Sequence, residues 1–189
     1  VASSPTHAPI LTSCPGVDVT LAYSPPGAGE AVRAWLAPVA RGARYEPQVD
    51  AADLGDRMRG ALQAQLDRGA VRVRRQRGEG LQVATLALAR RPPPSSLAAV
   101  VGSDIPDVTP EALTAVLDAL DGADLALAPC PDGGFWAVAT SAAPAALFRG
   151  VRWSCATART ETAAGAKEAG LRVAPDGAAP ELADVDTAR

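Results

Sequence analysis

Short apolar runs alternate with amphipathic stretches along the chain. Apolar or β-branched runs bounded by glycine, proline or aspartate predict strands, and they lie at residues 17–22, 97–101, 124–129, 135–140 and 171–174. Helices are predicted over residues 30–36, 54–66, 110–120 and 156–167, most clearly where apolar positions recur every third or fourth residue. This alternation predicts the α/β class, as a three-layer α/β/α sandwich around a mostly parallel sheet.

Two of the predicted helices carry clear start signals. Asp53 stands where an N-cap is expected, and Thr109 is followed by Pro110, a residue favoured in the first helical turn. Gly69 provides a stop for the first of these helices. We therefore expect both helices to begin at these positions.

The domain organisation follows from shifts in composition. Residues 1–16 form an irregular N-terminal segment rich in proline, serine and threonine, and residues 17–187 form a single domain. Residues 72–96 interrupt the pattern as an insertion that begins with a basic cluster. The cluster has no interleaved aromatic residues, so a solvated loop is favoured over contact with phosphate and no nucleic-acid partner is expected.

Composition excludes several kinds of chemistry. The formal net charge of -3 gives no drive toward nucleic acid, and the three cysteines form no C-x-x-C pair, so they are expected as core residues. The only histidine is His7, which excludes catalytic triads and histidine metal sites. No apolar stretch is long enough to span a membrane, which predicts a soluble protein of the cytoplasm or an organelle stroma. Carboxylates remain as the candidate functional groups.

Asp104 has the most suggestive position of these carboxylates. It directly follows the apolar strand at residues 97–101, and ligands of open α/β sheets bind beyond the carboxyl ends of the strands. Carboxylate oxygens are natural ligands of Mg²⁺ or Mn²⁺. A turn or helix-capping role for Asp104 remains open.

Two further groups of residues are candidates. Asp132 precedes Gly133 and Gly134, which allow a backbone to approach a ligand closely, although an ordinary hairpin turn explains the same residues. Asp184 and Asp186 flank one residue, so both side chains point to one face in extended structure and can share a cation. An exposed acidic tail is the alternative for this pair.

The motifs taken together resemble a known family. In chain order they are Tyr45-Glu46-Pro47-Gln48, Asp53-Leu54-Gly55-Asp56-Arg57-Met58, Gly102-Ser103-Asp104-Ile105-Pro106, Thr109-Pro110, Asp132-Gly133-Gly134-Phe135, Trp153-Ser154, Gly170-Leu171-Arg172-Val173 and Asp184-Val185-Asp186-Thr187. This set resembles the glycosyltransferase-like family of radical-SAM/selenodomain-associated transferases. That family is similar to GT-A glycosyltransferases and to guanylyltransferases acting on the molybdenum cofactor or on phospholactate. The resemblance implies a Rossmann-like, GT-A-like nucleotide-diphospho-sugar transferase domain over residues 17–187.

The resemblance also implies roles for individual residues. Asp104 would be catalytic and hold the cation on the donor diphosphate, and Asp184 or Asp186 would complete the metal or acceptor site. Asp132 is the second catalytic candidate, and with the two glycines it would border the acceptor pocket, whose side Trp153 and Ser154 could close. The positions expected near the nucleotide are Gln48, Asp53, Leu54, Gly55, Arg57, Gly133 and Gly134.

Three functions follow as alternatives. The first is metal-dependent transfer of a sugar from a nucleotide-sugar to an unknown small-molecule acceptor. The second is nucleotidyl transfer from a nucleoside triphosphate. The third is a catalytically inactive homologue, because the family's first strand and its basic phosphate loop are expected to be lacking here, where residues 1–16 stand instead.

Overall fold

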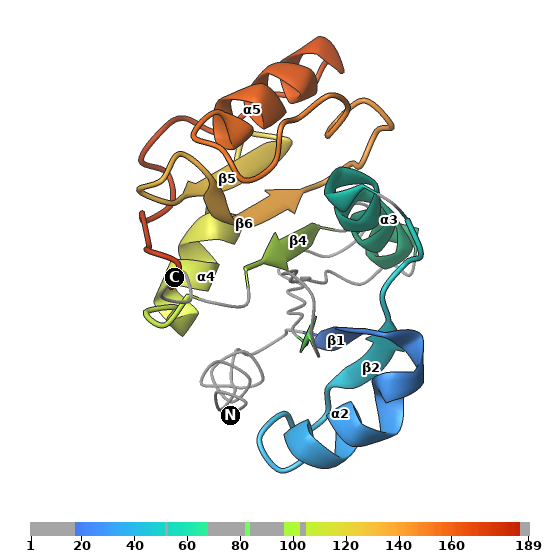
Figure 1. Cartoon of the computed structure of the whole chain (residues 1–189). Coiled ribbons are helices and arrows are strands. Elements are labelled where there is room, and N and C mark those ends of the chain that lie inside the picture. Colours follow the sequence, from blue (N-terminus) through green and yellow to red (C-terminus); the bar gives the residue numbers. More distant parts are fainter. Residues whose placement is uncertain (1–17, 52, 68–81, 84–96, 103–104, 186–189) are drawn as a thin grey trace.

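The computed structural model describes residues 18–51, 53–67, 82–83, 97–102 and 105–185. The strands within these residues form two three-stranded sheets, one with the order β2-β1-β3 and the other with the order β4-β6-β5 (Figure 1). Asp104, Asp186 and the basic cluster of the predicted insertion lie outside the described residues, as does the predicted N-terminal segment at 1–16.

The first sheet is built around β1 (Thr20–Ser24). It pairs in parallel with β2 (Arg44–Pro47), and the connection contains a short 3₁₀ helix η1 (Pro26–Ala28) and α2 (Gly29–Leu36). A helical crossover is what a parallel pair requires. On its other side, β1 pairs antiparallel with β3 (Gln82–Val83).

The second sheet consists of β4 (Ala98–Val101), β5 (Leu125–Pro129) and β6 (Phe135–Thr140). The central strand β6 pairs antiparallel with both neighbours, so the prediction of a mostly parallel sheet is wrong here. The reason is the short connection between β5 and β6. It leaves no room for a crossover, and it returns the chain as a hairpin.

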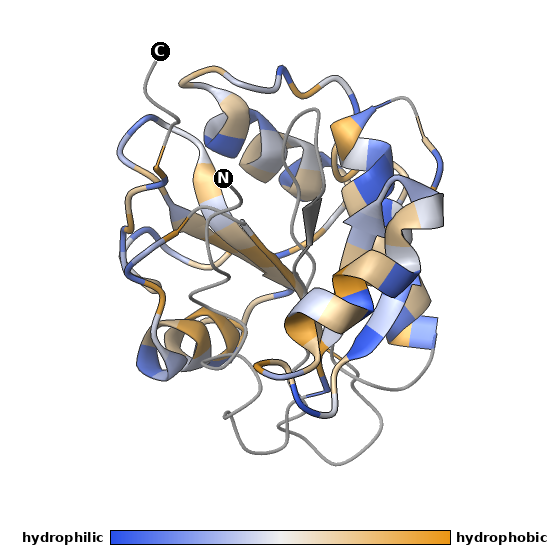
Figure 2. Cartoon of the chain, turned by 60° about the horizontal axis from the view of Figure 1, so that its bottom comes forward, coloured by the Kyte–Doolittle hydropathy of each residue, from blue (hydrophilic) through white to orange (hydrophobic). Residues whose placement is uncertain are grey.

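The second sheet contributes to a hydrophobic cluster on each face. Along β4, Ala99 and Val101 belong to a cluster that includes residues of α4 (Pro110–Asp118). Ala98 and Val100 belong to another, with residues of α3 (Leu54–Asp67) and α5 (Ala158–Glu168). Helices therefore cover both faces of this sheet. Figure 2 shows hydrophobic residues concentrated in the central strands and hydrophilic residues more common on the helices.

The predicted helix starts are confirmed. Thr109 Oγ1 accepts a hydrogen bond of 3.1 Å from the Ala112 amide at the start of α4. Asp53 Oδ1 accepts from the amides of Gly55 and Asp56 at 2.8 and 3.2 Å, both within the first turn of α3. These side chains satisfy backbone donors that the helix itself leaves without an acceptor.

Most predicted strands are also present, with three differences. One is β3, which lies within the predicted insertion at 72–96, where no strand was predicted. The segment at 171–174 contributes only an isolated parallel bridge between Val173 and Leu125. Strand β2 had no strand prediction, because its sequence Arg-Tyr-Glu-Pro shows no apolar run. Among the described residues, no helix combines the length and the apolar character that crossing a bilayer demands.

Candidate functional site

A tight hairpin loop joins β5 to β6. Cys130 follows the last residue of β5, and its amide donates to Gly134 O at 3.1 Å while Gly133 N donates to Cys130 O at 3.1 Å. Asp132 Oδ1 accepts from the Gly134 amide at 2.8 Å. An aspartate that accepts from an amide two residues ahead is a common turn-forming contact. The loop thus holds Cys130 and Asp132 at the carboxyl end of β5.

Gly133 brings this hairpin against the loop before α5. Its φ is +87°, in the region that favours glycine. A Cβ atom at this position would lie 2.2 Å from the carbonyl oxygen of Ala156, and the Gly133 carbonyl accepts from Arg159 N at 3.2 Å. The residue is therefore glycine for two independent steric reasons.

The C-terminal segment is attached to the same end of the second sheet. Trp136 Nε1 donates to Pro180 O at 2.9 Å, and Leu182 N donates to Pro129 O at 3.1 Å. Ala179 is 7% exposed and belongs to the core cluster on that side of the sheet. These contacts bring Asp184 to the hairpin, although it lies about 50 residues farther along the chain.

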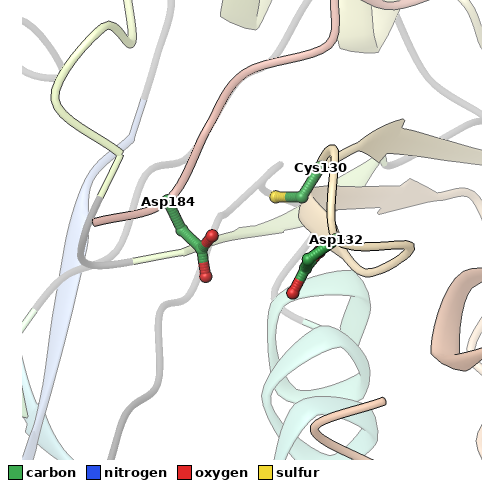
Figure 3. A group of neighbouring side chains, drawn as sticks. All are labelled: Cys130, Asp132 and Asp184. Atoms are coloured by element: carbon green, nitrogen blue, oxygen red, sulfur yellow. The ribbon is translucent and has the colours of Figure 1, made fainter. Parts of the chain in front are cut away.

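Cys130, Asp132 and Asp184 form one group, which we call the Cys130 group. The sulfur of Cys130 and one carboxylate oxygen of each aspartate all lie within 4.8 Å of one another. Figure 3 shows Asp184 on the C-terminal segment facing the two residues of the hairpin. Cys130 is buried, Asp184 is half-buried and Asp132 is exposed, so the group is open to solvent on one side.

Burial, together with the two carboxylates, determines the protonation state of Cys130. Burial raises the pKa of the Cys130 thiol to about 12, and the negative charges of Asp184 and Asp132 act in the same direction. A hydrogen bond from the Asp184 backbone opposes them. In the absence of a cation the sulfur is therefore a thiol at neutral pH.

A second set of predicted residues lies at the start of α3. Besides capping the helix, Asp53 accepts a hydrogen bond of 3.2 Å from Trp153 Nε1 through Oδ2. A Cβ atom on Gly55 would lie 2.6 Å from the Cβ of Phe148 and 3.0 Å from the ring of Trp153. Arg57 donates from Nε to the carbonyl oxygen of Ala51. These contacts give each residue a structural role, and nucleotide contacts for them stay predictions.

Trp153 links the start of α3 to the hairpin. Its ring lies edge-on to Phe135, the first residue of β6, with ring centroids 6.3 Å apart. It also packs against Phe148 at 5.9 Å. Ser154, which follows it, has a φ of +58°, unusual for a residue other than glycine. The tryptophan thus fixes the distance between Asp53 and the end of the second sheet.

The structure brings together some predicted residues and not others. Asp132 and Asp184 meet in the Cys130 group, and Gly134 lies within the same hairpin as Gly133. Asp104 and Asp186 lie outside the described residues. Gln48 follows β2, and its backbone N–H donates to Tyr23 O at 2.8 Å. Leu54, the first residue of α3, packs against the cluster that includes Met58 and Leu62.

Cys130 is the residue of this group that the sequence did not indicate as functional. It was expected in the core, and it is buried at 6% exposure, whereas Cys155 is only half-buried. The available signal was its place immediately after an apolar strand and two residues before Asp132. The same placement had drawn attention to Asp104.

Comparison with known proteins defines the class to which this arrangement belongs. The arrangement is an α/β domain with a carboxylate-containing group at the end of a strand. A family model described as "Uncharacterized protein conserved in bacteria (DUF2064)" matches residues 10–155, and the chain belongs to this DUF2064 family. Asp184 lies beyond the matched residues. No curated protein matches the chain.

A solved structure is similar over most of the chain. It is the crystal structure of a candidate nucleotide-diphospho-sugar transferase from Desulfovibrio desulfuricans G20, with a TM-score of 0.64 and 28% sequence identity over 90% of this chain. The chain spans 62% of the length of that protein's chain. The family and this structure support the GT-A-like transferase fold. Association with radical-SAM or selenodomain proteins stays a prediction.

Proposed function

We propose that this chain is the nucleotide-sugar-binding part of a divalent-cation-dependent glycosyltransferase. The observation that carries the proposal is the meeting of Asp132 and Asp184 at the carboxyl end of β5. Ligand sites of α/β sheets lie at such strand ends. The similarity to a candidate nucleotide-diphospho-sugar transferase supports the choice of donor.

The carboxylates of this site suit a divalent cation. Carboxylate oxygens bind Mg²⁺ and Mn²⁺, and the described residues supply two such groups within 4.8 Å of each other. Asp132 and Asp184 would hold the ion together with Asp104 and Asp186, which lie outside the described residues. When bound, the ion would neutralise negative charge on the departing diphosphate.

The proposed reaction is transfer of a glycosyl group to a hydroxyl of a small acceptor. The bond between the anomeric carbon and the diphosphate oxygen breaks, and its electron pair leaves with the nucleoside diphosphate. A new bond forms between that carbon and the acceptor oxygen. The proton that the hydroxyl loses passes to water, which reaches the exposed edge of the Cys130 group.

Calorimetric titration of a panel of nucleoside diphosphate sugars tests this function. With Mn²⁺ present, we expect one class of donor to bind, and we expect Asp184→Asn to weaken its binding by about tenfold or more, about 1.4 kcal/mol. The control is Glu168→Gln, which removes an exposed carboxylate on α5 and should leave the affinity unchanged.

Three results would contradict the proposal. One is the absence of donor binding in the presence of Mn²⁺, and another is equal donor affinity in the wild type and Asp184→Asn. The third is release of pyrophosphate from a nucleoside triphosphate in the presence of a phosphorylated acceptor, since that would identify nucleotidyl transfer instead.

A further inference from the structure

The Cys130 group contains a sulfur atom among its oxygens. The Cys130 side chain is 6% exposed, and its Sγ lies within 4.8 Å of a carboxylate oxygen of both Asp132 and Asp184. Cys130 belongs to the core cluster that includes α4, and its sulfur also lies beside these two carboxylates. Here the sulfur faces two carboxylates at the end of a strand, which is the arrangement of a ligand.

The three groups are held close to the geometry of a shared ion. Bond lengths to Zn²⁺ of about 2.3 Å for sulfur and about 2.1 Å for oxygen place two tetrahedral ligands roughly 3.6 Å apart. The three atoms lie within 4.8 Å of one another, so an inward movement of about 1 Å completes the set. Side-chain rotation suffices for a movement of this size.

The backbone around the group is already fixed. The hairpin hydrogen bonds hold Cys130 and Asp132, and Leu182 N holds the C-terminal segment to Pro129 O. A hydrogen bond from the Asp184 backbone reaches the Cys130 sulfur itself. The ligands come from two segments that the fold already attaches to each other. An ion would therefore bind residues whose backbone positions are set before it arrives.

The mixture of sulfur and oxygen determines which ion fits. Carboxylates alone suit Mg²⁺ and Mn²⁺, whereas a thiolate favours softer ions such as Zn²⁺ and Cd²⁺. For a given set of ligands, Zn²⁺ also binds more tightly than Mn²⁺. A site of one cysteine and two aspartates should therefore prefer Zn²⁺ over Mn²⁺, and Mn²⁺ over Mg²⁺.

We propose that Cys130, Asp132 and Asp184 form a divalent-cation site in which Cys130 is a direct sulfur ligand, selecting a thiophilic ion such as Zn²⁺ over Mg²⁺. The proposal deepens the cation dependence of the proposed function and rests on it for its catalytic meaning. On binding, the Cys130 thiol releases its proton to water, and the sulfur electron pair forms the bond to the metal.

Cadmium titration detects the sulfur ligand directly, because a Cd–thiolate bond adds a charge-transfer absorption in the ultraviolet. The protein for the test carries Cys14→Ser and Cys155→Ser, which leaves Cys130 as its single cysteine. We expect the absorption to saturate at one Cd²⁺ per chain. Zn²⁺ should displace the Cd²⁺, and a large excess of Mg²⁺ should not.

Two variants assign the ligands. Adding Asp184→Asn to the single-cysteine protein should weaken Cd²⁺ binding by about tenfold or more, whereas adding Glu168→Gln should leave it unchanged. Cys130→Ser in the otherwise natural chain should lower Zn²⁺ affinity by at least about tenfold and change Mg²⁺ affinity by less than about twofold. Circular dichroism of each variant verifies that it is folded.

Absence of the charge-transfer absorption in the single-cysteine protein would overturn the proposal even if Cys130→Ser does not fold. Equal Zn²⁺ affinity in the wild type and a folded Cys130→Ser would overturn it as well. The failure of the proposed function is a separate outcome. Donor binding with Mn²⁺ but no Cd–sulfur absorption removes only the sulfur ligand, and Cd–sulfur absorption without donor binding removes only the transferase.

Discussion

Gly133 shows how a single residue positions the candidate site. Its positive φ and its contact with the backbone of Ala156 make the hairpin both tight and closely packed. Cys130 and Asp132, which precede Gly133 in the hairpin, are thereby held near Asp184 of the C-terminal segment. The motif Asp-Gly-Gly is therefore a structural requirement of the Cys130 group as well as a candidate binding element.

Replacing Gly133 with alanine should destabilise the protein strongly. The left-handed backbone costs about 1 to 2 kcal/mol for alanine, and the new Cβ would lie 2.2 Å from Ala156 O, so the hairpin must also shift. We expect a total loss of roughly 2 to 4 kcal/mol in the free energy of unfolding, measured by urea denaturation.

Gly122→Ala is the matched control for this substitution. Gly122 also has a positive φ, +88°, but a Cβ there would meet nothing within 4 Å. The control should lose only the backbone contribution of about 1 to 2 kcal/mol. Equal losses in the two variants would show that the contact with Ala156 is unimportant.

At the level of elements, α3 is positioned by its first residues. Asp53 caps the helix with one carboxylate oxygen and accepts from Trp153 with the other. Trp153 in turn contacts Phe135 at the start of β6. One carboxylate thus joins the helix start to the second sheet, which explains the aspartate without any nucleotide.

Asp53→Ala should destabilise the protein more than the loss of an ordinary cap. An N-cap contributes about 1 kcal/mol, and the hydrogen bond to Trp153 adds about 0.5 to 1.5 kcal/mol. We expect a loss of roughly 1.5 to 2.5 kcal/mol by thermal or urea unfolding.

Thr109→Ala removes a cap of the same kind from α4, with an expected loss of about 1 kcal/mol. Thr109 also hydrogen-bonds the exposed carboxylate of Glu111, but among the described residues it has no aromatic partner comparable to Trp153. If Asp53→Ala costs no more than this control, the bond to Trp153 contributes nothing to stability. If Asp53→Ala leaves stability unchanged but abolishes binding of the nucleotide-sugar donor, the predicted role of Asp53 at the nucleotide gains support instead.

At the scale of the whole molecule, Asp124 ties the second sheet to the segment after α5. Its carboxylate accepts three hydrogen bonds of 2.8 to 3.0 Å from Arg172, two from the guanidinium and one from the backbone amide. These bonds lower the pKa of Asp124 from 3.8 to about 2. The ion pair of Asp124 with Arg172 lies next to the parallel bridge between Val173 and Leu125, so both contacts attach this segment to the edge strand β5.

The lowered pKa predicts an acid-dependent contribution to stability. Because the folded-state pKa lies below the unfolded value of 3.8, the contribution is fully present above that value and is lost as pH falls through about 2. We expect Asp124→Asn to be less stable than the wild type near neutral pH. The difference in urea midpoints should shrink as pH falls from about 4 toward about 2.

Glu168→Gln, which changes an exposed carboxylate on α5, serves as the comparison for this variant. Its urea midpoint should follow that of the wild type at every pH. A constant difference between Asp124→Asn and the wild type over the acid range would show that the ion pair with Arg172 does not cause the stabilisation.

How much of this protein was predictable differs between levels of organisation. The caps at Asp53 and Thr109 and the apolar strands were evident because these features depend on residues near one another in the chain. Strand β2 was missed because its residues lack an apolar run, and its position comes from pairing with β1. The antiparallel second sheet followed from a hairpin whose loop was recognised but whose consequence for strand direction was not.

The sequence by itself determined the elements, their order and the carboxylates worth testing, since hydrophobic periodicity and turn chemistry act over a few residues. Only the tertiary structure decided that Asp184 meets Cys130 and Asp132. That meeting depends on two hydrogen bonds, from Trp136 to Pro180 and from Leu182 to Pro129, that join the second sheet to a C-terminal segment distant in sequence. Local patterns carry no information on such contacts, because the free energy that selects them comes from burying surfaces that belong to different elements.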